Sequence, residues 1–119
     1  MYKVSILADF SSAHMLRGYK GKCENLHGHN WKVEVFVYSK KLDKLGMVID
    51  FKDLKKAVYS VLEELDHKNL NDLKYFKKVN PTSENIAEYI YDRVQSIEYR
   101  VQKVTVWESD VARATYTRK

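Results

Sequence analysis

The 119-residue sequence contains one cysteine, one proline and four glycines. A single cysteine cannot form an intramolecular disulfide, which excludes a small fold held together by disulfide bridges. No stretch approaches the roughly 20 consecutive apolar residues of a membrane-spanning helix. The first residues also lack the basic and apolar segments of a secretory signal. We therefore expect a cytoplasmic protein that does not cross a membrane.

The abundant residue types are those of an ordinary globular protein. Hydrophobic residues make up 45% of the chain and charged residues 31%, and a chain of this length suits one domain over residues 1–119. The formal net charge is +5. Basic and acidic residues are mixed along the chain, whereas nucleic-acid-binding proteins usually show a clustered basic stripe. We expect a small polyanionic substrate and no nucleic-acid partner.

The spacing of apolar residues predicts the order strand, strand, helix, helix, strand, strand. Alternation favours strands over residues 3–10, from residue 31, over residues 101–108 and from about residue 112 to 117. Three- and four-residue spacing favours a helix capped by Asp50 and a second helix after Pro81, capped by Thr82 or Ser83. The expected core positions of the two helices are Phe51, Leu54, Val58, Val61, Leu62 and Leu65, and Ile86, Ile90, Val94 and Ile97.

This order predicts an α+β fold, with a four-stranded antiparallel sheet and both helices on one of its faces. The strand that begins at residue 31 carries large apolar or aromatic side chains on both faces, so two helices would leave one face uncovered. The sheet would also have open edges, which proteins usually protect. Pairing between neighbouring subunits into a closed barrel solves both problems, and we expect a homo-oligomer.

Residues 11–30 hold three of the four histidines, three of the four glycines and the only cysteine. This composition indicates a loop that carries a functional site. His27 and His29 are two residues apart, so a backward extension of the second strand would place both imidazoles on one face. With His14 as a third ligand, they would suit Zn²⁺ at about 2.0–2.1 Å and leave one position open, as catalytic zinc sites do.

For two further candidate site residues, a purely structural role is the alternative to a role in the site. Cys23 is either a small buried apolar residue or a reactive thiolate, because zinc and the nearby Lys22 would both favour the charged form. Glu108 would point to the apolar face of its strand, where an ionised carboxylate needs a partner. It would therefore be either a ligand anchor or the partner of an arginine.

The dipeptide Asp66-His67 falls at the far end of the first predicted helix. A histidine at this position complements the negative end of the helix dipole, and that structural interpretation is favoured from the dipeptide alone. A role for the pair in the site is the alternative.

Seven segments of the chain resemble, in the same order, the sequence blocks of the 6-pyruvoyl-tetrahydropterin synthase and 6-carboxy-tetrahydropterin synthase family. They are residues 10–14 (FSSAH), 21–23 (GKC), 26–30 (LHGHN), 46–51 (GMVIDF), 65–71 (LDHKNLN), 80–85 (NPTSEN) and 107–109 (WES). The resemblance covers nearly the whole chain, and together the blocks are much more specific than one short spacing.

The resemblance implies the tunnelling fold, in which sheets from several subunits close into a barrel with active sites at subunit contacts. A hexamer is the assembly that it favours. The family's zinc ligands match His14, His27 and His29, its catalytic cysteine matches Cys23, its catalytic relay pair matches Asp66 and His67, and its pterin-anchoring glutamate, also at the catalytic site, matches Glu108.

Only three residues separate Cys23 from His27, which resembles the 6-carboxy-tetrahydropterin synthase branch of queuosine biosynthesis. The resemblance then implies a zinc-dependent lyase that converts 7,8-dihydroneopterin triphosphate to 6-carboxy-5,6,7,8-tetrahydropterin, acetaldehyde and triphosphate. The alternatives are a 6-pyruvoyl-tetrahydropterin synthase and a non-catalytic zinc- or pterin-binding module. The basic residues near the blocks, which are candidates for triphosphate contacts, are Arg17, Lys20, Lys22 and Lys68.

Overall fold

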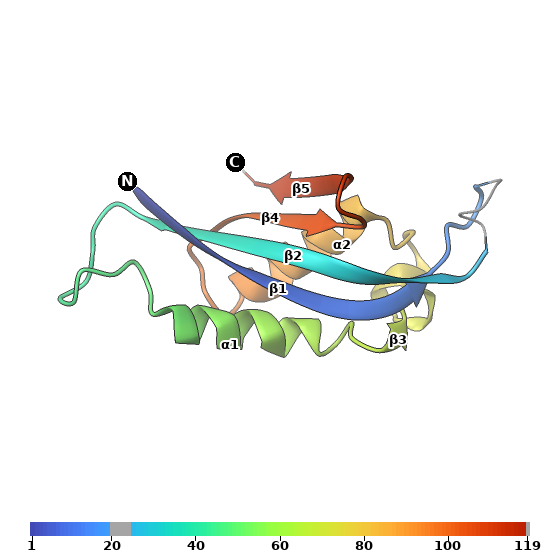
Figure 1. The fold of residues 1–119 in the computed structure, drawn as a ribbon, viewed down its shortest axis with the longest axis horizontal. Coiled ribbons are helices and arrows are strands. Elements are labelled where there is room, and N and C mark those ends of the chain that lie inside the picture. The colour runs from blue at the N-terminus through green and yellow to red at the C-terminus, as the bar shows by residue number, and fades with distance from the viewer. Residues whose placement is uncertain (20–24, 119) are drawn as a thin grey trace.

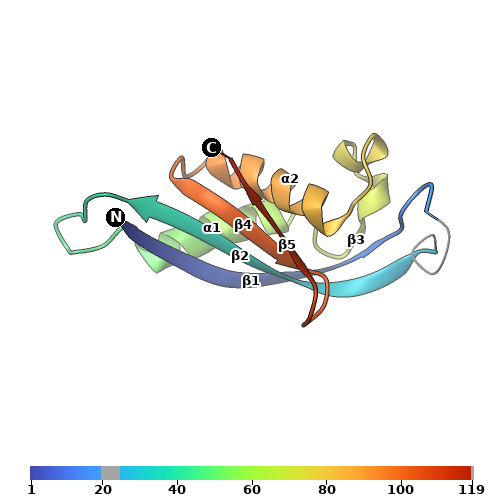
Figure 2. The ribbon, with the colours of Figure 1, turned by 90° about the horizontal axis from the view of Figure 1, so that it is seen from above.

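The computed structural model describes residues 1–19 and 25–118, in which five strands form one sheet with helices α1 and α2 on one face (Figure 1, Figure 2). The strands are β1 (Tyr2–His14), β2 (His27–Ser39), β3 (Lys68–Asn69), β4 (Val101–Trp107) and β5 (Arg113–Thr117), in the spatial order β3-β1-β2-β4-β5. The helices are α1 (Phe51–Leu62) and α2 (Ser83–Gln95). Between them lie two short 3-10 helices, η2 (Leu70–Asp72) and η3 (Tyr75–Lys77).

β1 and β2 form a long antiparallel ribbon that runs along the molecule and ends at the pair His14–His27 (Figure 1). Successive residues of a strand point to opposite faces, so one face of the ribbon, called the inner face below, lies under the helices. The inner face of β2 carries fully buried apolar side chains: Trp31, Val33, Val35 and Val37. The alternation that predicted this strand is confirmed.

Capping side chains fix the starts of both helices. The carboxylate of Asp50 accepts a hydrogen bond from the backbone N–H of Lys52, and the hydroxyl of Thr82 accepts one from that of Asn85. These are the bonds expected of N-cap residues, and they identify Thr82 as the cap of α2. In the described part of the chain, no helix is long and apolar enough to span a bilayer.

The α+β arrangement, with two helices on one face and four antiparallel strands, is confirmed, but the sheet has one strand more than predicted. The two-residue strand β3 adds a fifth member and pairs in parallel with Ser12 and Ala13 of β1. Strand pairing also continues to His14 and begins again at His27, so both ends of the segment predicted as a loop are strand. The ladder extends past the apolar pattern because backbone pairing does not depend on apolar side chains.

Both helices end earlier than the apolar spacing predicted, α1 at Leu62 and α2 at Gln95. Phe51 and Ile97 were expected in the core, but each is 56% exposed. α1 ends three residues before Leu65, which is buried in the turn that follows. Periodicity indicates which side of a helix faces the core, but it does not fix where the helix stops.

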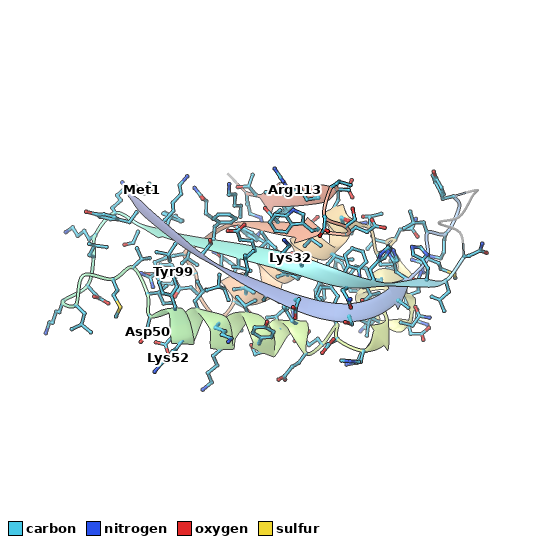
Figure 3. The ribbon with its side chains drawn as sticks, viewed as in Figure 1. Met1, Lys32, Asp50, Lys52, Tyr99 and Arg113 are labelled. Carbon is cyan, nitrogen blue, oxygen red and sulfur yellow. The ribbon has the colours of Figure 1, made fainter. Side chains whose placement is uncertain are left out.

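The outer face of the sheet, opposite the helices, carries large apolar side chains that no helix covers. Leu7 is mostly exposed, and Trp107 is half-buried with the ammonium group of Lys32 5.0 Å from its ring centroid. Figure 3 labels Lys32 on β2 and Arg113 on β5, whose guanidinium also lies over Trp107. This face is the one expected to pair in a homo-oligomer, and the oligomer stays a prediction.

Candidate metal centre

The three predicted histidines meet on the inner face at the end of the β1–β2 ribbon. His14 is paired with His27 across the two strands, and His29 projects from the same face two residues along β2. One ligand atom from each histidine and one from Glu108 all lie within 4.8 Å of one another. The shared face predicted from the two-residue spacing is therefore confirmed, and Glu108 joins the group.

Hydrogen bonds indicate which nitrogen of two imidazole rings carries the proton. Nδ1 of His14 lies 2.7 Å from the carbonyl oxygen of Pro81, and Nδ1 of His27 lies 2.7 Å from that of Asn25. A carbonyl oxygen can only accept, so each Nδ1 donates its proton and Nε2 of each neutral ring is unprotonated. The two Nε2 atoms face each other at 3.1 Å. Lone pairs at this separation repel unless a positive charge lies between them.

Glu108 brings a negative charge to the same point. It follows directly after β4, is 34% exposed, and has Oε1 3.0 Å from Nε2 of His29 and 3.7 Å from Nε2 of His14. Nε2 of His29 is buried, and despite this close approach it has no hydrogen-bond partner among the described residues. The hydroxyl of Ser83 donates to Oε2 at 3.4 Å. The carboxylate thus faces histidines and not the arginine considered as an alternative.

The electrostatics of the cluster favour a metal ion over a proton as the positive charge. Burial lowers the pKa of His14 and of His29 below the ordinary value of 6.5, although the Pro81 carbonyl at His14 and the Glu108 carboxylate act in the opposite direction. Both rings are therefore neutral near pH 7. Three imidazoles that meet at one point are a donor set typical of catalytic zinc and leave one position open, so the histidines present fit that ion.

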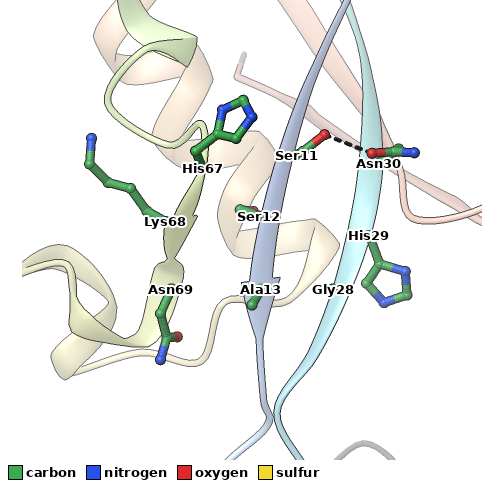
Figure 4. Close-up of a pocket in the computed structure, with 9 residues that line it drawn as sticks. All are labelled: Ser11, Ser12, Ala13, Gly28, His29, Asn30, His67, Lys68 and Asn69. Atoms are coloured by element: carbon green, nitrogen blue, oxygen red, sulfur yellow. Dashed lines mark hydrogen bonds between the residues drawn. The ribbon is translucent and has the colours of Figure 1, made fainter.

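Asp66 and His67 form a second polar group, at the edge strand β3. Asp66 Oδ1 accepts the backbone N–H of Ser11 at 2.9 Å, which lowers the pKa of Asp66, and Oδ2 lies 3.0 Å from Nδ1 of His67. The interpretation as a helix terminus is wrong, because α1 ends at Leu62. The side chain of His67 is 82% exposed, and β1 lies between it and His29 (Figure 4). Neither Asp66 nor His67 belongs to the group of possible metal ligands among the described residues.

A shallow hollow of about 450 Å³ lies beside the pair, across β3, β1 and β2. Its lining includes Ser11, Asn30, His67 and Lys68, and Ser11 donates to the side-chain oxygen of Asn30 at 2.6 Å across the ribbon (Figure 4). Sequence reasoning gave Asn30 no role. The only available signal was its place directly after His29, which puts it on the opposite face of β2.

The remaining site predictions have mixed outcomes. Cys23, Lys20 and Lys22 lie outside the described residues. Arg17 donates from its guanidinium to the carbonyl oxygens of Phe76 and Val79, and Nζ of Lys68 lies 3.3 Å from that of Glu63. Both described candidates for triphosphate contacts therefore bind backbone carbonyls of their own chain.

Comparison with known proteins identifies the family. Residues 3–119 match the profile described as 6-pyruvoyl tetrahydropterin synthase. The chain belongs to this family. It is 41% identical over 107 residues to a putative 6-carboxy-5,6,7,8-tetrahydropterin synthase of Archaeoglobus fulgidus, a match that covers 90% of this chain and 88% of the relative.

Both branches of the family are found among the relatives. The human 6-pyruvoyl tetrahydrobiopterin synthase is 44% identical over 96 residues, covering 76% of this chain and 66% of the human one. A solved structure of Caenorhabditis elegans 6-pyruvoyl tetrahydropterin synthase superposes with a TM-score of 0.91 at 32% identity, covering 99% of this chain and 96% of that one. The chain therefore has the subunit fold that the sequence resemblance implied, and the closure of several subunits into a barrel stays a prediction.

Proposed function

We propose that the chain is a zinc-dependent 6-carboxy-5,6,7,8-tetrahydropterin synthase that acts on 7,8-dihydroneopterin triphosphate, in queuosine biosynthesis. The observation that carries the proposal is the convergence of Nε2 of His14 and Nε2 of His27, 3.1 Å apart, beside His29 and Glu108. This arrangement needs a positive charge. The tetrahydropterin synthases among the named relatives support the reaction class.

The chain's own side chains would bind the substrate and move its protons. When bound, zinc would supply Lewis-acid polarisation of the substrate's side-chain hydroxyls. Glu108 would accept hydrogen bonds from the pterin amino group and ring N–H, since a carboxylate offers two acceptor oxygens in one plane. Cys23 would remove a proton from the polarised side chain. A positioned base of this kind contributes about 10²- to 10⁴-fold in rate.

Asp66 and His67 would act as a proton relay. The backbone N–H of Ser11 stabilises the ionised carboxylate of Asp66, which holds Nδ1 of His67 at 3.0 Å and leaves the other ring nitrogen to exchange a proton. Because the ring is exposed and lies across β1 from His29, we assign the pair to the metal centre of a neighbouring subunit in a homo-hexamer. The uncovered outer face of the sheet supports such an assembly.

The choice of branch depends on the short segment before the metal ligands. Three residues between Cys23 and His27 favour the carboxy-pterin branch, and the Archaeoglobus relative, 41% identical, carries the name of that branch. The 44% identity to the human protein keeps 6-pyruvoyl-tetrahydropterin synthase as the second candidate.

Product analysis tests the proposal. Zinc-loaded protein would be incubated with 7,8-dihydroneopterin triphosphate and the products identified by mass. We expect 6-carboxy-tetrahydropterin, acetaldehyde and triphosphate. A pyruvoyl-pterin would select the second candidate instead.

A matched variant separates catalysis from binding. Cys23→Ala should retain zinc and pterin binding and lose product formation, because it removes the proposed base without touching a metal ligand. Absence of any turnover by the unmodified, zinc-loaded chain would favour the non-catalytic binding module.

A further inference from the structure

A side-chain amide takes over the role of a strand partner where β1 ends. The ladder stops at the pair His14–His27, so Met15 is left without a partner strand. Asn71 supplies both missing bonds: its Oδ1 accepts the backbone N–H of Met15 at 2.9 Å, and its Nδ2 donates to the carbonyl of Met15 at 3.0 Å. Asn71 is 6% exposed. The backbone immediately after His14 is thus fixed by a buried residue distant in sequence.

Asn80 repeats this pattern two residues further along. Its Oδ1 accepts the backbone N–H of Arg17 at 3.0 Å, and its Nδ2 donates to the carbonyl of Arg17 at 2.9 Å. The carbonyl of Asn80 itself accepts from Nδ2 of Asn85 on α2 at 2.8 Å. The segment before α2 is therefore tied both to the helix and to the chain that leaves β1.

The hydrogen bonds of Asn71 and Asn80 both affect the position of the His14 imidazole. Asn71 holds the backbone next to His14, and Asn80 holds the backbone next to Pro81, whose carbonyl accepts from Nδ1 of His14. That hydrogen bond places the proton on Nδ1 and leaves Nε2 of His14 free toward His27 and Glu108. Groups that orient a metal-binding histidine in this way tune affinity without touching the ion.

We propose that Asn71 and Asn80 are positioning residues of the metal centre, which fix the ring orientation and tautomer of His14 through the chain end and the Pro81 carbonyl. The inference rests on the proposed metal function of the histidines. Loss of either amide should weaken zinc binding by about 10- to 100-fold, the range typical of groups that support metal ligands.

The test combines metal affinity with a direct observation of the tautomer. Asn71→Ala and Asn80→Ala would be compared with the unmodified chain by chelator competition for zinc. ¹⁵N-histidine NMR of the metal-free protein would follow the His14 tautomer, in a spectrum of only four histidines. Tyr91→Phe is the control, because it removes a buried hydrogen bond of 3.3 Å to the Val101 carbonyl, away from the metal centre. Far-UV circular dichroism would establish that each variant is folded.

We expect both asparagine variants to bind zinc about 10- to 100-fold more weakly and to show a mixture of His14 tautomers, while the control changes neither. If Asn71→Ala does not fold, the zinc affinity and the His14 tautomer of Asn80→Ala, at a more exposed position, test the inference. Zinc affinity within twofold of the unmodified chain, together with an unchanged tautomer, would overturn the inference. If the unmodified chain binds no zinc, the proposed function fails, and the tautomer comparison still tests the positioning.

Discussion

The two halves of the β1–β2 ribbon share one backbone geometry but carry opposite chemistry on the inner face. One half of β2 presents Val33, Val35 and Val37, all fully buried beneath the helices. The other half presents His27 and His29. Register and alternation therefore decide only where a side chain points. Its identity decides whether the position stabilises the fold or binds a ligand.

Trp31 marks the boundary between the halves. Its ring stacks on Phe10 with the centroids 6.0 Å apart, and on its other side it makes edge contacts with His14 and His29 at 4.9 and 5.2 Å. A fully buried aromatic residue thus separates the apolar core from the histidines. It gives the rings an apolar wall, which contributes to the burial that lowers the pKa of His14 and His29.

The histidine half of the ribbon contributes less to the stability of the fold than the valine half. Oγ of Ser12 is buried without a hydrogen-bond partner among the described residues, and such an atom costs about 1–3 kcal/mol. The valine half has no side-chain polar atoms on its inner face to satisfy. A cluster that breaks this packing rule is where a functional site is expected.

The largest expected effect on folding comes from the core that the valine half of the ribbon shares with helix α1. Leu54→Ala should lower the free energy of unfolding by about 3 kcal/mol, because Leu54 is fully buried and its truncation leaves a cavity. Urea denaturation followed by circular dichroism measures this change. Leu45→Ala, at a position 81% exposed, is the control and should change stability by less than about 0.5 kcal/mol.

If the two halves are independent, folded Leu54→Ala retains the zinc affinity of the unmodified chain. A parallel loss of zinc affinity would contradict the division of the ribbon into a stabilising and a metal-binding half.

A smaller effect is expected from a polar contact in the helix layer. The hydroxyl of Tyr89 on α2 donates to Oε1 of Glu64 at 2.6 Å, and Arg93 contacts the same carboxylate at 2.9 Å. Tyr89→Phe should lower the free energy of unfolding by about 1.5 kcal/mol, the low end for a bond to a charged group, since Arg93 still pairs with Glu64. Tyr99→Phe, at an exposed tyrosine, is the matched control.

The pH dependence of the same pair has a definite sign. Burial, and then the hydrogen bond to Glu64, raises the pKa of Tyr89 to about 12, from about 10 in the unfolded chain. The contribution of Tyr89 is therefore fully present below pH 10 and is lost as the pH rises toward 12. The stability difference between the unmodified chain and Tyr89→Phe should be constant below pH 10 and shrink above it. A constant difference up to pH 12 would show that the hydroxyl is not held as described.

Much of the fold and part of the site could be predicted from local patterns. Alternation predicted the strands, and the two-residue spacing of His27 and His29 correctly placed both rings on one face. Local patterns could not predict that β3 exists, because two residues carry no periodicity. They also could not predict the bonds that Asn71 and Asn80 make, because each joins segments more than 50 residues apart.

The position of Asp66 and His67 shows the same limit. Helical periodicity continued to Leu65 and so predicted a helix terminus, whereas the chain leaves the helix at Leu62. His67 then adopts a φ of 55°, which is uncommon for a residue other than glycine. The hydrogen bonds to the backbone of Ser11 that accompany this conformation form only after β1 and β3 have come together.

The smallest expected effect on folding comes from the histidine half, together with a large effect on metal binding. His29→Gln should change the stability of the metal-free chain by less than about 1 kcal/mol, because glutamine keeps much of the volume and polarity of the position. Zinc affinity should fall by more than the roughly 100-fold seen when a supporting group is lost, since a ligand itself is gone.

His67→Gln is the matched control: it is also a histidine near the end of the ribbon, but it is not in the group of possible metal ligands among the described residues. It should leave zinc affinity within twofold. A large stability loss in His29→Gln would mean that the histidine half is part of the core after all, and equal zinc losses in both variants would place the metal outside the His14–His27–His29 cluster. We expect Leu54→Ala to lose more stability than His29→Gln, and His29→Gln to lose more zinc affinity than Leu54→Ala. The division of the ribbon into two halves requires both results.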